Sequence, residues 1–145
     1  MKEVEGVVVA LYKPTGDYHR FAVLKRDVNW EGWELPKGRL DDTEDPEKAA
    51  RREIKEETSI EPVSITDLDE IHEWEYEQDG EKRHAKYHAF MAEAPENAFI
   101  DVSDNPDKDE HSKGHFLNLR DTKDVLTHEN QRELVEKVAE RLQEQ

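Results

Sequence analysis

Apolar residues near the start of the chain gather in two short runs that are separated by turn-forming residues. Residues 4–11 are almost continuously apolar, and residues 20–26 form a second run that contains Phe21 and Leu24. Runs of this length, bounded by Pro, Gly and Asp, are typical of strands that are buried on both faces. The pattern therefore predicts two central strands, joined by a turn around residues 14–17.

From residue 65 onward, polar and apolar side chains alternate, which is the period of a strand with one solvated face. Trp74 and Tyr76 fall on one side of this strand, and the intervening glutamates fall on the other. The Asp-Gly dipeptide at 79–80 is a strong signal for a two-residue hairpin turn. Residues 82–94 are therefore expected to return as the hairpin partner.

Helical signals appear in two segments of the chain. Asp45 is a good N-cap and Pro46 suits the first helical position, so a helix is predicted from here to about Thr58. Leu134, Val138 and Leu142 recur at helical spacing, which predicts an amphipathic helix in the tail from about Thr127.

The remaining segments have fewer regular features. Residues 29–38 contain too many helix and strand breakers for a long element, so they predict a loop with at most a short strand. Residues 97–113 have almost no apolar content and predict a solvated acidic loop, and residues 115–119 predict one more strand. The element order favours a single α/β domain.

Composition narrows the chemistry that the chain can perform. A length of 145 residues fits one domain, and the absence of cysteine excludes disulfides, thiolate metal sites and a cysteine nucleophile. With 21 basic and 37 acidic residues the net charge is −16, so nucleic acids and anionic membranes are poor partners. No apolar run is long enough for a signal peptide or a membrane span, which predicts a cytoplasmic protein.

The acidic composition also suggests an environment. A surface of this kind repels itself at low ionic strength, and the repulsion largely disappears near ~1 M salt, where the Debye length is ~3 Å. The charge is consistent with a halophilic protein of a salt-rich cytoplasm, and a generic acidic protein is the alternative. The ordered apolar pattern argues against disorder, although charged residues outnumber hydrophobic ones, at 40% against 34%.

Three glutamates share one face of the first predicted helix. At 100° per residue, Glu53, Glu56 and Glu57 fall within about 100° of arc. They repel one another and lie near the negative end of the helix, which is locally unfavourable. Clustered carboxylates of this kind suit a hard divalent cation such as Mg²⁺, with Mn²⁺ as a second possibility. Chance clustering on an acid-rich helix is the alternative explanation of this face alone.

The wider pattern around this helix is more specific. Gly38, Glu44 and residues 52–60 resemble the signature of Nudix hydrolases, which reads Gly, five residues, Glu, seven residues, then Arg-Glu-aliphatic-any-Glu-Glu-any-Gly-aliphatic. Ser59 departs from the signature, which has Gly there, and Thr43 replaces a residue that is commonly small. Because Gly supplies a left-handed helix exit, we expect a local backbone change at Ser59, with metal binding retained.

The resemblance implies a fold and a metal site. The implied fold is an α/β/α sandwich around a mixed sheet, with one Nudix domain over residues 1–145 and the motif as loop–helix–loop at 38–60. Arg52 is implied to orient the helix glutamates, and Glu44 to be a structural or outer partner. The residues that the resemblance assigns to the metal are Glu53, Glu56, Glu57 and the backbone carbonyl of Gly38.

The implied reaction is metal-dependent hydrolysis of a nucleoside diphosphate linked to another group, X, in which a carboxylate accepts the proton of the attacking water. Glu110-His111, Pro36-Lys37-Gly38 and Tyr76 are similar to features of the asymmetric diadenosine tetraphosphate hydrolases. This similarity makes Glu110 the candidate base, with Glu53 or another motif carboxylate as the alternative. It also makes Lys37 the candidate for phosphate binding, with a solvated loop lysine as the alternative. Tyr76 or Tyr87 is the candidate to stack on adenine, with packing within the hairpin as the alternative for either ring.

The resemblance is compatible with several classes of substrate. The expected partner is a small-molecule nucleotide, with a dinucleoside polyphosphate as the first choice. Sanitation of oxidised nucleoside triphosphates and cleavage of ADP-ribose are alternatives, and a non-catalytic nucleotide sensor is the alternative outside enzymes. A diphosphoinositol is disfavoured because the chain offers few clustered basic residues for so anionic a ligand. The oligomeric state is not predicted.

Overall fold

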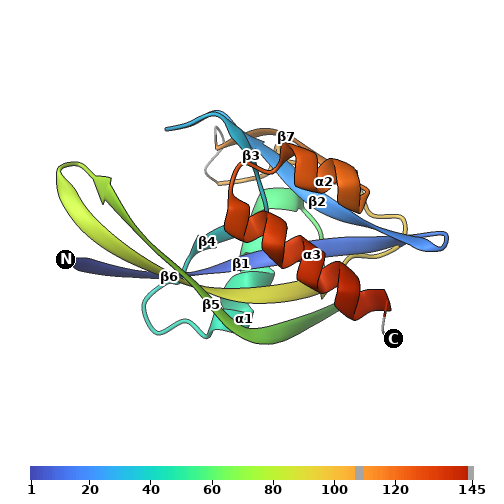
Figure 1. The fold of residues 1–145 in the computed structure, drawn as a ribbon, viewed down its shortest axis with the longest axis horizontal. Helices are drawn as coiled ribbons and strands as arrows, with labels where there is room; N and C mark the ends of the chain where they lie inside the picture. Colours follow the sequence, from blue (N-terminus) through green and yellow to red (C-terminus); the bar gives the residue numbers. More distant parts are fainter. Residues whose placement is uncertain (107–109, 144–145) are drawn as a thin grey trace.

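The computed structural model describes residues 1–106 and 110–143 (Figure 1). In chain order the elements are β1 (Lys2–Thr15), β2 (Tyr18–Arg26), β3 (Gly32–Glu34), β4 (Lys37–Arg39), α1 (Pro46–Thr58), β5 (Ser64–Gln78), β6 (Glu81–Glu93), β7 (His111–Leu117), α2 (Leu119–Val125) and α3 (Glu129–Gln143). Within these residues, no helix is both long enough and apolar enough to span a membrane.

The strands form one mixed sheet, with the main order β3-β2-β1-β6-β5. β1 runs parallel to β6 and antiparallel to β2, while the short β4 also pairs with β1 and β7 pairs with β2. Helix α1 lies on one face of the sheet, and α2 and α3 lie on the other (Figure 1). The expected α/β/α sandwich around a mixed sheet is therefore confirmed.

Two hydrophobic cores, one on each face of the sheet, explain why the sequence of β1 is an almost continuous apolar run. Val7 and Val9 pack with Ile54 on the α1 side, whereas Val8 and Ala10 pack on the opposite side, toward α3. Because successive strand residues point to opposite faces, a strand covered on both faces needs apolar residues at every position.

Helix α1 begins and ends with local signals in the sequence. The Asp45 carboxylate accepts a hydrogen bond from the backbone N–H of Lys48, and Pro46 opens the helix as predicted. At the other end Ser59 adopts φ 64° and ψ 20°, so it makes the left-handed exit that glycine would make. The expected backbone change at this position is therefore wrong. The Ser59 hydroxyl donates to the carbonyl of Asp101 at 3.0 Å, which supports the unfavourable conformation.

The β5–β6 hairpin follows the prediction, and both residues of its Asp79-Gly80 turn have positive φ. The predicted acidic loop at 97–113 and strand at 115–119 need correction, because β7 already begins at His111 and ends at Leu117. The polar start of this strand is ordered by pairing with β2, a contact that its local composition does not signal. Within the loop, Asp107 and Asp109 lie outside the described residues.

Two further differences are small. The expected loop at 29–38 contains the short strands β3 and β4, which pair with β2 and β1. Helix α2 had no apolar period long enough to predict it, although Asn118 caps it by accepting a hydrogen bond from the N–H of Asp121 at 2.8 Å.

Candidate active site

A cleft of about 1130 Å³ opens beside the carboxyl-terminal half of α1. Its walls come from the strand ends and loops around β4, the β5–β6 hairpin, the residue preceding β7, and the start of α3. Basic, acidic and aromatic side chains all reach it: Arg26, Lys37, Arg39 and Arg52; Glu53, Glu56 and Glu110; Trp30, Trp74, Tyr76 and Tyr87. A surface with both signs of charge beside aromatic rings suits a phosphorylated ligand that carries a base.

Helix α1 presents its acidic face toward this cleft because its apolar face is fixed on the sheet. Ala50 and Ile54 are fully buried, and the basic residues on the opposite side are exposed. Glu53 and Glu57 are buried, and Glu56 is half-buried at the cleft. The structure thus brings together the three carboxylates that the sequence predicted on one face.

Gly38 lies directly against this face. A Cβ atom at Gly38 would overlap the carboxyl group of Glu53, so only glycine leaves room for that side chain. β4 pairs with β1 at this point, with Gly38 opposite Val7. The spacing between Gly38 and the helix glutamates in the sequence therefore corresponds to a direct contact in the fold.

Burial and like charge perturb the two inner glutamates. Burial raises the pKa of Glu53 to about 7, with Arg52 opposing the shift. Burial, together with the charges of Glu53 and Glu110, raises the pKa of Glu57 well above its ordinary value. Oε2 of Glu57 is also buried without a hydrogen-bond partner. These crowded, under-satisfied carboxylates fit a divalent cation, which would supply the missing positive charge.

Arg52 connects most of the acidic residues of the motif. Its guanidinium binds both oxygens of Glu44 at 2.9 Å and Oε1 of Glu53 at 2.8 Å, and it reaches Oε2 of Glu56 at 3.2 Å. A further N–H donates to the carbonyl of Arg39 at 3.0 Å. The hydrogen bonds from Arg52 lower the pKa of Glu44 to about 2. This geometry is what an orienting role for Arg52 and an outer role for Glu44 require.

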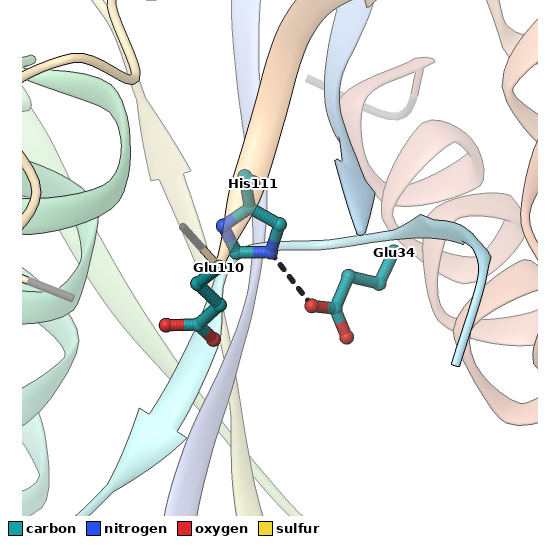
Figure 2. Close-up of side chains that lie close together, drawn as sticks. All are labelled: Glu34, Glu110 and His111. Carbon is teal, nitrogen blue, oxygen red and sulfur yellow. Dashed lines mark hydrogen bonds and ion pairs between the residues drawn. The ribbon is translucent and has the colours of Figure 1, made fainter. Parts of the chain in front are cut away.

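A second charged cluster lies beside the helix glutamates and contains residues that the sequence did not single out. Glu34 is fully buried, and its Oε2 atom lies 2.7 Å from Nε2 of His111 (Figure 2). Nη1 of Arg26 donates to Glu34 and to Glu110, at 3.0 Å in each case. Burial alone would raise the pKa of Glu34, but His111, Lys37 and Arg26 together lower it. Because 77 residues separate Glu34 from His111, no local signal predicts their contact.

Ligand atoms of Glu34, Glu110 and His111 lie within 4.8 Å of one another, a spacing that could hold a metal ion. The Arg26 guanidinium already supplies a positive charge to both carboxylates, however. Within the part of the chain that the structure describes, Glu57 of the helix cluster forms no ion pair with a lysine or an arginine, so we regard that cluster as the better candidate for the metal.

The residues expected to bind substrate occupy different depths of the cleft. The Lys37 ammonium lies over the rings of Trp74 and Tyr87, 5.7 and 5.5 Å from their centroids. Tyr87 is only 7% exposed and packs against Trp74, and its burial raises its pKa to about 12. Tyr76 is more accessible, and its hydroxyl accepts a hydrogen bond from Arg39 at 3.2 Å. Tyr76 is therefore better placed to meet a ligand than Tyr87.

Of the two tryptophans near the motif, only Trp30 lines the cleft, where its ring meets that of His128 edge-on at 4.9 Å. Trp33 packs against the core on the α3 side of the sheet.

Comparison with known proteins gives a family match over almost the whole chain. The model of the NUDIX domain matches residues 2–138. An RNA pyrophosphohydrolase from Zymomonas mobilis is 37% identical over 54 residues, which cover 37% of this chain and 35% of the relative. The chain thus matches about a third of the length of that curated relative.

Solved structures with the same fold cover the chain almost completely. A binary complex of the Caenorhabditis elegans Ap4A hydrolase superposes with a TM-score of 0.77 at 24% identity, covering 98% of this chain and 99% of the other. Another structure of the Caenorhabditis elegans Ap4A hydrolase is 26% identical, with a TM-score of 0.68 and the same coverage.

Proposed function

The chain belongs to the NUDIX domain family, and from that premise we propose that it hydrolyses a pyrophosphate bond in a nucleoside diphosphate linked to another group, X. The observation that carries this proposal is the cleft that is lined both by carboxylates, among them the buried Glu53, and by four basic side chains. Carboxylates can hold a divalent cation, and basic side chains can hold phosphate oxygens.

In the proposed site, Glu53, Glu56 and Glu57 hold Mg²⁺ or Mn²⁺ together with the backbone carbonyl of Gly38. The metal would neutralise the pyrophosphate and make water a stronger nucleophile. Arg52 keeps the glutamates in place through the hydrogen bonds described above. Gly38 keeps the volume in front of Glu53 open.

Glu110 is the proposed general base. Its carboxylate lines the cleft and lies close enough to Glu53 and Glu57 to raise their pKa values. From this position it can accept the proton of the attacking water, a contribution that is typically worth ~10²–10⁴-fold in rate. Glu53 or another motif carboxylate is the alternative base.

The preferred substrate is a dinucleoside polyphosphate such as diadenosine tetraphosphate. Lys37 and Arg39 are placed to contact the phosphate chain, and Tyr76, at the cleft, is placed to stack on a base. The similarity in fold to the Caenorhabditis elegans Ap4A hydrolase supports this choice.

The triphosphate end of an RNA is a second candidate substrate, because the curated relative described above is named an RNA pyrophosphohydrolase. The net charge of −16 disfavours it, since a polyanionic chain would be repelled outside the site itself. Nucleoside triphosphates and ADP-ribose are further candidate substrates, and nucleotide sensing is the candidate role outside enzymes.

A salt-rich cytoplasm is the proposed environment of the protein, because of its net charge of −16.

One panel of reactions distinguishes these candidates. The protein is incubated with Mg²⁺ and, separately, with diadenosine tetraphosphate, ATP, ADP-ribose and a 5′-triphosphate RNA, and the products are identified by chromatography. In ¹⁸O-water, diadenosine tetraphosphate should give ATP and AMP, with the label in one product. ADP as the sole product would contradict asymmetric attack, and nucleotide binding without cleavage of any substrate would favour the sensor.

A further inference from the structure

The ends of three strands meet at one buried carboxylate. Arg26 ends β2, Glu34 ends β3, and His111 begins β7 directly after Glu110. Oε2 of Glu34 lies 3.0 Å from Nη1 of Arg26 and 2.7 Å from Nε2 of His111, so it interacts with both side chains at once. Figure 2 shows the His111 ring directed toward the Glu34 carboxylate, with Glu110 extending beside it.

The burial of this group requires an explanation. The side chains of Glu34 and His111 are 0% and 1% exposed, and a carboxylate removed from water is costly unless charged and hydrogen-bonding partners surround it. Glu34 has these partners at Oε2, whereas its Oε1 makes no hydrogen bond and lies 3.8 Å from the Lys37 ammonium. A side chain that served packing alone would be better replaced by an apolar residue of similar volume.

The two residues that pair with Glu34, Arg26 and His111, each also lie next to a carboxylate of the proposed active site. Nη1 of Arg26 also binds Oε1 of Glu110 at 3.0 Å, and Nδ1 of His111 lies 3.6 Å from Oε2 of Glu57. The pairing of β2 with β7 shifts register between Lys25 and Arg26, which places Arg26 opposite His111. Glu34 therefore interacts with the residues that pair with Glu110 and Glu57. It pairs with neither of these two carboxylates itself.

We propose that Glu34 is a positioning residue, which orients Glu110 through Arg26 and Glu57 through His111. This inference rests on the proposed function, because it takes Glu57 as a metal ligand and Glu110 as the base. Fixing the guanidinium and the imidazole from a buried anchor removes rotamer freedom from side chains at the cleft. The arrangement joins the helix that carries the proposed metal ligands to the residue just before β7, Glu110, which is the proposed base.

The test compares Glu34→Gln with Glu70→Gln. Glutamine keeps the shape of the side chain and removes its charge. Glu70 is a matched control, because it also pairs with a histidine, His72 at 3.1 Å, and with a cation, Lys137 at 2.7 Å, away from the cleft. Melting temperature is measured for each variant, so that a change in function can be separated from a loss of the fold.

Mn²⁺ binding without substrate is measured by electron paramagnetic resonance, and kcat and KM are measured with the substrate that the panel identifies. We expect Glu34→Gln to weaken Mn²⁺ binding by about 10-fold and to lower kcat by about 10–100-fold, the range for partners of metal ligands. KM should change by less than about 3-fold, and Glu70→Gln should match the wild type. A Glu34→Gln protein with the wild-type Mn²⁺ affinity and kcat would overturn the proposal.

A double variant separates positioning from an independent role. If Glu34 acts on the reaction through Glu110, the substitution Glu34→Gln should lower kcat by a smaller factor in the Glu110→Gln protein than in the wild type. Fully additive losses would overturn the route through Arg26. Loss of one bound Mn²⁺ per chain in Glu34→Gln would instead make Glu34 a metal ligand and would also contradict the proposal.

Two further outcomes are distinguishable. If Glu34→Gln does not fold, Arg26→Gln breaks the same network from its more exposed end, and an unchanged kcat in that variant would overturn the proposal. If the wild type cleaves no substrate in the panel, the proposed function fails, while the Mn²⁺ titration still tests whether Glu34 orients Glu57.

Discussion

The backbone N–H of Lys37 donates a hydrogen bond of 2.9 Å to Oε1 of Glu57. This bond ties the strand that carries Lys37 and Gly38 to the last turn of α1. Oε1 accepts this backbone hydrogen bond, whereas Oε2 has no hydrogen-bond partner, so Oε2 is the atom of Glu57 that is more open to a metal. One carboxylate therefore joins α1 to the residue just before the first glycine of the family signature.

Replacing Glu57 with glutamine should abolish most of the activity while preserving the fold. The amide oxygen can still accept the hydrogen bond from Lys37, but the charge toward the metal is lost. We expect kcat to fall by at least ~100-fold, the scale for damage to a metal site. Glu61→Gln is the matched control, because Glu61 is exposed and pairs with Lys55 on the surface. A Glu57→Gln enzyme with near wild-type turnover would remove Glu57 from the site.

A divalent metal should both activate and stabilise the protein. Binding to the folded state alone raises the free energy of unfolding by ~2.7 kcal/mol at a concentration of 100 Kd. Thermal melts with Mg²⁺ or Mn²⁺ should therefore show a higher Tm than melts with excess chelator, and the increase should shrink in Glu57→Gln. Full activity in chelator would contradict the metal assignment.

The proposed base predicts a specific kinetic change. Because proton transfer occurs only in the transition state, Glu110→Gln should lower kcat by ~10²–10⁴-fold and change KM much less. The matched control is Asp104→Asn, because Asp104 is an exposed acidic residue of the same loop. Asp109, the acidic residue next to Glu110, lies outside the described residues. Equal activity in the two variants would return the role to Glu53 or another motif carboxylate.

Elements with strong local signals could be predicted from the sequence. The Asp45-Pro46 start of α1 and the Asp79-Gly80 turn are determined within a few residues, and both lie where they were predicted. The acidic face of α1 follows from helical geometry alone, and the structure confirms that Glu53, Glu56 and Glu57 share it.

Features that depend on distant contacts could not be predicted. The first residues of β7 are polar and become a strand only by pairing with β2. A glutamate such as Glu34, in a loop rich in breakers, is typical of a solvated position, and only the folded chain brings His111 to it. Ser59 keeps its left-handed exit because Asp101 lies beside it, with the N–H of Asp101 donating to the carbonyl of Thr58.

The ion pair between Glu44 and Arg52 predicts a pH-dependent contribution to stability. The pKa of Glu44 is about 2 in the folded protein, below its ordinary 4.5, so this contribution is complete above the ordinary value and disappears as pH falls toward 2. Glu44→Gln should lose about 1–2 kcal/mol of unfolding free energy at pH 7, as expected for a partly exposed charged hydrogen bond. Denaturant unfolding of both proteins at a series of pH values should show the difference shrinking between about pH 5 and pH 2. A constant difference would contradict the assignment.

The net charge predicts a response to salt. If the charge of −16 is an adaptation to a salt-rich cytoplasm, screening should relieve self-repulsion, and Tm should rise as KCl increases toward molar concentration. Thermal melts in a KCl series measure this directly. A flat or falling Tm would contradict the proposed environment and leave the enzymatic proposal unaffected.

The close approach of Gly38 to Glu53 has an evolutionary consequence. A single added methyl group at Gly38 would take the volume that the Glu53 carboxyl group occupies, whereas the pairing of β4 with β1 is made by the backbone. On the proposed assignment, one codon change at this position separates a hydrolase from a protein with the same scaffold and a damaged catalytic centre. After a gene duplication, a copy with this change would keep the cleft and could come to recognise nucleotides without cleaving them.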